Sequence, residues 1–121
     1  MSSLKNRVQL IGNVGQAPTI TNLDDGKKVA RFSFATNEGY KDKKGEKHTD
    51  TNWHTIVAWG KNADFVENYL KEGHFVALTG KLKSGSYDTD NGEKKYYTEV
   101  VANHFSFLSK NPKDTPSTEE E

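Results

Sequence analysis

The sequence predicts an all-β domain that carries one short helix. Runs of β-branched and aromatic residues recur along the first 110 residues, with polar and glycine-containing turns between them. One segment alone, residues 62–72, has the spacing of an amphipathic helix. Because hydrophobic residues make up 32% of the chain and charged residues 28%, we expect a small core filled largely by aromatic side chains.

Three strands are predicted before the helix. Residues 8–14 alternate between apolar and polar positions, residues 28–36 place two phenylalanines on one face, and residues 53–59 are β-branched and aromatic. The segment 38–51 is hydrophilic and rich in lysine, so we expect either a long exposed loop or a frayed hairpin there.

The helix is predicted over residues 62–72. Asn62 can cap its N-terminus, and Gly73 follows as the stop signal. Its apolar stripe consists of two pairs spaced by four residues, Phe65 with Tyr69 and Val66 with Leu70.

Two further strands follow the helix. They are predicted over residues 75–87 and 94–102, with residues 105–108 as an extension of the second. Asn91-Gly92 between them predicts a type I′ hairpin turn.

This order of elements is the layout of the OB-fold, a five-stranded Greek-key barrel with one short helix between strands three and four. The alternative is an open α+β sandwich with the helix packed on one face. We expect the OB-fold domain to cover residues 1–110. Residues 111–121 hold prolines, polar residues and acids without an apolar side chain, which predicts a short disordered acidic tail.

The net charge of zero conceals two unlike parts. Residues 1–110 carry 16 Lys or Arg and 13 Asp or Glu, whereas residues 111–121 carry one Lys and four acids. The domain is therefore mildly basic, and what matters for binding a polyanion is whether its lysines gather on one face.

Several classes of function are disfavoured. With no cysteine, the chain can form neither a disulfide nor a thiolate metal site, and the spacing of its four histidines predicts no metal site. We find no nucleophile motif, phosphate-binding loop or cofactor motif, so we expect neither an enzyme nor a bound cofactor. The sequence also lacks a signal peptide and an apolar run of transmembrane length, which favours the cytoplasm.

Two tryptophans on one strand face give the first functional signal. Side chains alternate along a strand, so one face carries Trp53, Thr55, Val57 and Trp59. The opposite face, which we expect to be buried, carries His54, Ile56 and Ala58. A surface that stacks nucleic-acid bases has a use for two exposed indoles, which a core strand lacks. Duplex DNA hides the faces of its bases, so the pattern favours single strands.

The fourth predicted strand has a similar face. Period two places Lys81, Lys83 and Tyr87 on one side, and Tyr40 stands where the lysine-rich segment begins. Lysines can hold phosphates and tyrosines can stack on bases. The competing interpretation is that Lys and Tyr serve β propensity and edge protection, but the tryptophans favour nucleic acid. RNA stays open as a ligand, because stacking does not read the 2′-hydroxyl.

Six short segments carry a family resemblance over about residues 4–108. They are Arg7–Pro18, Val29–Glu38, Thr51–Val57 with Gly60-Lys61, Tyr69–Gly73, Leu78–Leu82 and Tyr97–Ala102. Each is a weak signal alone, but in series and with this spacing they are specific. They resemble the bacterial single-stranded DNA-binding protein family.

The resemblance implies an OB-fold protein that binds single-stranded DNA without sequence preference and protects it during replication, recombination and repair. It implies a cytoplasmic, nucleoid-associated homotetramer, built partly by pairing of the strand that holds Val8 and Leu10, with His54 at the subunit interface. The stacking and phosphate-binding residues are expected at Tyr40, Trp53, Trp59 and Tyr87 and at Arg7, Lys61, Lys83 and Lys95, to which the strand pattern adds Lys81.

Two departures from the family pattern modify these expectations. Thr55 and Gly85 stand where the family often has a basic residue, so we expect fewer phosphate contacts, each of which changes the salt slope by about 0.7 for a single strand. The sequence ends in Glu119-Glu120-Glu121 instead of an acidic Pro-Phe tip, so we expect poor recruitment of other replication or repair proteins.

Two other classes of function are alternatives to single-stranded DNA binding. An OB-fold interaction subunit of a replication or restart complex, with weak intrinsic DNA affinity, would bury the same aromatic residues against a protein partner. A metal-dependent nuclease is disfavoured, because no strand face carries a cluster of carboxylates.

Overall fold

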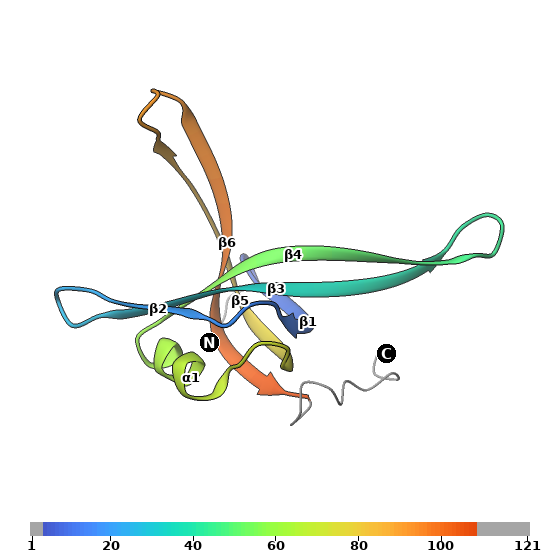
Figure 1. Cartoon of the computed structure of the whole chain (residues 1–121), viewed down its shortest axis with the longest axis horizontal. Coiled ribbons are helices and arrows are strands. Elements are labelled where there is room, and N and C mark those ends of the chain that lie inside the picture. The colour runs from blue at the N-terminus through green and yellow to red at the C-terminus, as the bar shows by residue number, and fades with distance from the viewer. Residues whose placement is uncertain (1–3, 109–121) are drawn as a thin grey trace.

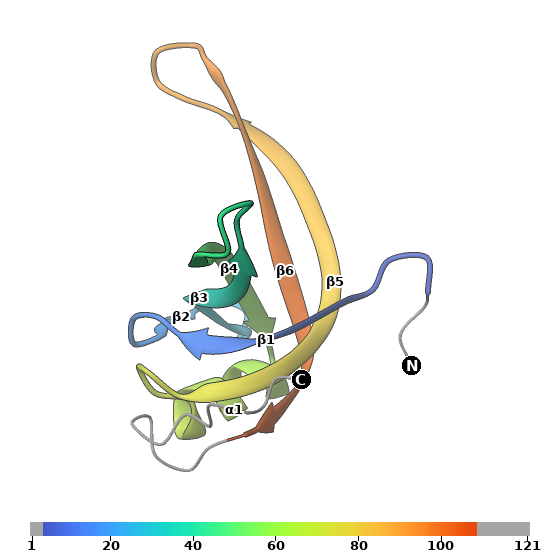
Figure 2. The same cartoon turned by 90° about the vertical axis from the view of Figure 1, so that its right-hand side faces the viewer.

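The described part of the chain consists of strands interrupted by one helix, as the sequence predicts. The computed structural model describes residues 4–108, so the expected tail lies outside the described residues. The elements are β1 (Val8–Val14), β2 (Thr19–Asn22), β3 (Lys28–Lys41), β4 (Lys47–Trp59), α1 (Lys61–Tyr69), β5 (Phe75–Asp88) and β6 (Lys94–Phe107). The β3–β4 and β5–β6 pairs form two long ribbons that project from a centre holding β1 and α1 (Figure 1, Figure 2).

Five of the strands close into a barrel. Neighbouring strands follow the order β1-β5-β6-β4-β3, and β1 returns to pair with β3 through Asn13 and Val14. The β4–β6 pair is parallel and the other pairs are antiparallel. With α1 between the third and fourth barrel strands, this is the expected OB-fold, and the open-sandwich alternative is wrong.

Strand β2 was not predicted from the sequence. These four residues lie outside the barrel and pair with Lys28–Arg31 at the start of β3. The strand is too short for its alternation to be distinguished from a loop, and Pro18 precedes it. Pairing with β3 therefore decides its conformation.

The lysine-rich segment is a hairpin and not an open loop. Pairing of β3 with β4 continues without a break from Val29 opposite Trp59 to Lys41 opposite Lys47. The hydrophilic composition gave no strand signal, because both faces of this part of the ribbon are exposed. The continuous pairing of β3 with β4 therefore stabilises this hairpin.

The core lies between the inward faces of the barrel strands. Phe34, Ile56, Val76 and Leu78 are fully buried, and the ring of Phe32 lies 6.3 Å from that of Phe105. Further buried members of this core are Val14, Ala30, Ala58, Ala63, Val66, Leu70, Val100 and Ala102. The alternation predicted for residues 53–59 holds, except that Val57 on the tryptophan face is also buried. Val57 lies between Arg31 of β3 and Val101 of β6, in the middle of the sheet.

The helix is shorter than predicted. Its N-cap is Gly60, at φ 58° and without a side-chain capping hydrogen bond, so the expected cap at Asn62 is wrong. It ends at Tyr69, before the predicted end, because Leu70 is already extended and turns back into the core. Within residues 4–108, no helix is long and apolar enough to span a membrane.

An ion-pair cluster fastens the helix to the sheet. The Nζ of Lys28 on β3 lies 2.8 Å from Asp64 and 2.5 Å from Glu67 of α1. Hydrogen bonds to these two carboxylates, Asp64 first, raise the pKa of Lys28 above its ordinary value of 10.5.

Two glycines allow the barrel to close. A Cβ on Gly12 would collide with the backbone oxygen of Ala35, where β1 crosses β3. A Cβ on Gly80 would collide with the backbone oxygen of Val101, at the bulge between Thr79 and Gly80 where β5 bends against β6. Because glycine has no side chain, β1 and β5 can approach their neighbouring strands closely at these two positions.

We expect Gly12→Ala to destabilise the fold by about 1–3 kcal/mol, because its methyl group forces β1 away from β3. Gly39→Ala is the matched control, since its Cβ would meet nothing closer than the His48 backbone oxygen at 3.8 Å. Urea unfolding at one fixed protein concentration measures both variants. Equal unfolding midpoints for the two would contradict the close-approach argument.

Candidate nucleic-acid interface

A shallow depression of about 390 Å³ lies on the outer face of the sheet, where four adjacent strands contribute to it. We call it the β3–β6 depression; its lining residues are Arg31, Trp59, Lys83, Tyr87, Tyr97 and Glu99. It brings together three of the predicted site residues, Trp59, Lys83 and Tyr87. The other three lining residues were not predicted.

Aromatic rings dominate this depression. Trp59 is 42% exposed and Tyr87 is 57% exposed, so both rings present area that a base can cover. The Tyr87 and Tyr97 rings are tilted at 35° with their centroids 6.5 Å apart. Three aromatic side chains around one hollow can hold flat ligands by stacking.

Tyr97 owes its position to Gly85. The two residues lie opposite each other in the β5–β6 ribbon, and a Cβ on Gly85 would lie only 2.6 Å from Cζ of the Tyr97 ring. The ring therefore lies across β5 in the space that a side chain would fill. Gly85, at which the sequence predicted the loss of a phosphate contact, has this packing role in the structure.

The turn of the β5–β6 ribbon determines that register. Asn91 lacks the positive φ that a type I′ turn requires, so the predicted turn type is wrong. Instead, Gly92 at φ 83° closes a longer turn, in which its N–H donates to the Thr89 oxygen. A two-residue turn at 91–92 would have shifted the pairing by one residue and placed Tyr97 elsewhere.

Charges of both signs line the same depression. The guanidinium Nη2 of Arg31 lies 2.9 Å from Oε2 of Glu99. Lys83 stands opposite Glu99 in the β5–β6 register and makes no ion pair with another residue of the described chain. The depression therefore combines stacking rings with two cations and one carboxylate.

Trp53 forms a separate platform on the same face. Its side chain is 63% exposed, and a Cβ on Gly15 would lie 2.7 Å from its ring. Trp59 lies six positions further along β4, a distance of about 20 Å. Trp53 and Trp59 therefore mark two points along one extended surface.

Tyr40 provides a third platform towards the hairpin end. Its ring stacks on that of His48, with the centroids 5.2 Å apart and the planes 23° apart. The two rings and the neighbouring Lys41 and Lys47 line a hollow of about 300 Å³. This combination of an exposed ring with lysines repeats the chemistry of the β3–β6 depression.

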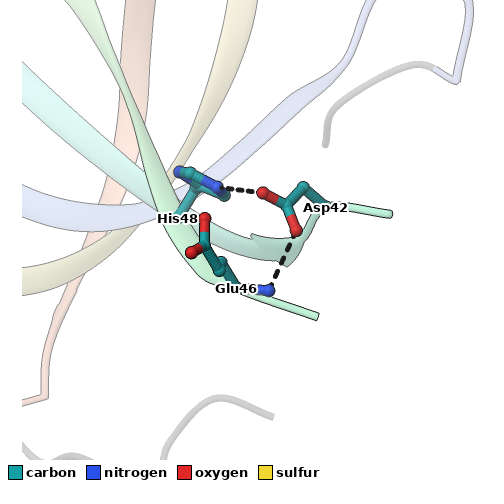
Figure 3. A group of neighbouring side chains, drawn as sticks. All are labelled: Asp42, Glu46 and His48. Carbon is teal, nitrogen blue, oxygen red and sulfur yellow. Dashed lines mark hydrogen bonds and ion pairs between the residues drawn. The ribbon is translucent and has the colours of Figure 1, made fainter. Parts of the chain in front are cut away.

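The tip of this hairpin is fastened by Asp42 (Figure 3). Its Oδ1 accepts hydrogen bonds of 2.9 Å from the backbone N–H groups of Lys44 and Glu46, and its Oδ2 lies 2.8 Å from Nε2 of His48. These bonds, that from His48 first, lower the pKa of Asp42 below its ordinary value of 3.8.

Asp42, Glu46 and His48 also place potential metal-ligand atoms within 4.8 Å of one another. Sequence spacing did not reveal this group. Because the Asp42 oxygens already serve the turn, we interpret the group as a structural fastening of the hairpin.

The remaining predicted cations are spread over the surface. Lys95 stands opposite Tyr87, at the rim of the β3–β6 depression, and Lys81 stands two residues before Lys83. Lys61 lies apart, in a hollow of about 250 Å³ beside α1. Arg7 is exposed immediately before β1. The structure thus groups Lys83 and Lys95 with the aromatic rings and leaves Lys61 outside that group.

The predicted interface residues lie around β1. Nε2 of His54 is 3.0 Å from the Thr36 hydroxyl, in a hollow of about 310 Å³ that Gln9 and Ile11 also line. The side chains of Val8 and Leu10 are partly buried against the core. Their main contribution to any contact with another subunit is therefore the backbone edge of β1.

We expect the Asp42 carboxyl to titrate below pH 3.8. The lowered pKa means that its stabilisation of the hairpin tip is present above that pH and is lost as the pH falls through the folded-state value. An NMR titration of the carboxyl carbon, with the Lys44 and Glu46 amide resonances followed in parallel, measures this. In Asp42→Asn the Lys44 amide resonance should lose its acid transition, because a lysine has no carboxyl group of its own. A midpoint at or above 3.8 would contradict the assigned hydrogen bonds.

The model of the single-strand binding protein family matches residues 5–108. Single-stranded DNA-binding protein 1 of Chlorobaculum tepidum is 43% identical over 104 residues, which are 85% of this chain but only 64% of that protein's length. The solved structure of the Plasmodium falciparum SSB complex with ssDNA has a TM-score of 0.80 and 37% identity, covering 90% of this chain and 98% of that one. The chain therefore belongs to the single-strand binding protein family.

Proposed function

We propose that this protein binds single-stranded DNA without sequence preference, by stacking bases on surface aromatics and holding phosphates with lysine and arginine. The observation that carries the proposal is the meeting of Trp59, Tyr87 and Lys83 in one depression. Relatives named for single-stranded DNA binding, one of them solved in complex with ssDNA, support it.

The three platforms give the strand a path. It would begin in the β3–β6 depression, follow β4 to Trp53 and then cross to the opposite face of the β3–β4 ribbon, where strand alternation places the Tyr40–His48 pair. Each stacked base contributes about 1–3 kcal/mol, as judged by truncation of its aromatic partner. Every base has a π-face, so this mode of binding tolerates any sequence.

The biological role follows from this chemistry. A protein that covers bases and phosphates protects exposed strands during replication, recombination and repair, and we propose a binding role without catalysis for it, at the nucleoid in the cytoplasm. Arg7, Lys61, Lys81 and Lys95 remain proposed phosphate contacts.

Tryptophan fluorescence tests the function directly. We expect titration with oligo-dT to quench the fluorescence in a saturable way, and added salt to weaken the binding as phosphate contacts release counterions. Trp53→Phe and Trp59→Phe assign the quenching to each indole while keeping a ring. In Trp59→Ala, affinity should fall by about 1–3 kcal/mol. Absence of quenching at low salt would instead favour an OB-fold interaction subunit whose aromatics contact a protein.

We also propose a homotetramer assembled partly through β1. Residues Val8–Asn13 of β1 pair with β5, but only Asn13 and Val14 pair with β3. The other backbone edge of Val8–Ile11 is thus unpaired within the described chain, and such an edge can pair with a second copy. Beside it, Ile11 is 52% exposed in the hollow that holds His54.

We expect light scattering to give the mass of a tetramer, and Ile11→Lys to lower it by placing a charge at the proposed contact. Leu23→Lys is the control, because Leu23 is an exposed leucine on the turn between β2 and β3, away from β1. A monomeric mass for the unsubstituted protein would refute the assembly. An equal loss of mass in both variants would refute the β1 contact.

A further inference from the structure

The proposed DNA-binding surface contains a carboxylate, that of Glu99, whose presence DNA binding does not explain. Glu99 is the only carboxylate among the lining residues of the β3–β6 depression, where the others are aromatic or cationic. A negative charge in that position repels the phosphates that the surface has to hold. No sequence pattern predicted a role for Glu99.

The side chain of Glu99 is more deeply buried than that of Arg31, its ion-pair partner. The side chain of Glu99 is 15% exposed, whereas that of Arg31 is 53% exposed. Nη2 of Arg31 donates to Oε2 of Glu99 over 2.9 Å. The carboxylate therefore stays in the sheet surface, and the guanidinium is the member of the pair with freedom to turn towards a ligand.

Phosphate and Glu99 require the same donors. An arginine presents its N–H groups in a planar fork that suits either a carboxylate or a phosphate. While Glu99 occupies part of that fork, the charge of Arg31 is neutralised locally. Lys83, across the ribbon from Glu99, then remains as the cation of the depression without an ion-pair partner in the described chain.

We propose that Glu99 sets the strength and salt dependence of single-strand binding by withholding the Arg31 guanidinium from phosphate. This inference rests on the proposed function. Glu99 occupies the Arg31 guanidinium in place of a phosphate. The affinity for the DNA strand is therefore lower than the number of cations suggests. With a moderate affinity, the protein can release a strand as well as bind it.

The test compares oligo-dT binding by tryptophan quenching at several salt concentrations for three variants. Glu99→Gln keeps the shape and the acceptor oxygen but removes the charge. Glu72→Gln removes the same charge from an exposed position on the turn after α1, outside the depression. The double variant Arg31→Gln/Glu99→Gln removes both charges of the pair and keeps the local net charge. Circular dichroism and thermal melting verify that each variant is folded.

We expect Glu99→Gln to bind about three- to fivefold more tightly than Glu72→Gln at low salt. Its salt slope should be steeper by about 0.7, the value of one added phosphate contact to a single strand. The double variant should match the unsubstituted protein in affinity within about twofold and in slope. These results together would establish that Arg31 is withheld.

Three outcomes would overturn the inference. If Glu99→Gln behaves like Glu72→Gln, its charge does not control Arg31. If it binds more weakly, the carboxylate positions Arg31 for binding. If the double variant loses about 0.7 of slope, Arg31 already contacts phosphate in the unsubstituted protein. Failure of the unsubstituted protein to bind oligo-dT would instead refute the proposed function, so the two failures are distinguishable.

Discussion

The short pairing between β1 and β3 is the contact on which the rest of the structure depends. It converts a row of hairpins into a closed barrel, and the absence of a side chain at Gly12 gives it room. Closure gives each barrel strand one face towards the core and one towards the outside. The outer faces of β3, β4, β5 and β6 then adjoin, and the β3–β6 depression forms on them.

The depression itself depends on cross-strand register more than on any single residue. Gly85 and Tyr97 are twelve positions apart in the chain, and they face each other only because Gly92 closes the longer turn. The space left by the glycine receives the tyrosine ring, which lines the β3–β6 depression. At this pair, the β5–β6 ribbon therefore contributes stacking area to the surface and no positive charge.

This balance suits a mildly basic domain. With 16 basic and 13 acidic residues in its first 110 positions, the chain cannot rely on net charge to hold a polyanion. The Arg31–Glu99 pair reduces the local charge further. Stacking on well-separated rings does not weaken in the same way when salt screens the charges, so the aromatics carry the larger part of the proposed binding.

The sequence by itself determined the strand faces, the single helix and the family. Alternation along residues 53–59 was sufficient to place Trp53 and Trp59 outwards and Ile56 inwards, because the period of a strand is a local property of the backbone. The family motifs indicated the fold as well, because they are short contiguous segments that are recognisable in the sequence alone. Tertiary structure decided the conformation of β2 and the hairpin formed by residues 38–51, where pairing partners and not local pattern select the strand. It also decided which distant side chains meet: Arg31 with Glu99 and Tyr97 with Gly85 depend on register, which one residue of turn length changes and which no local pattern encodes.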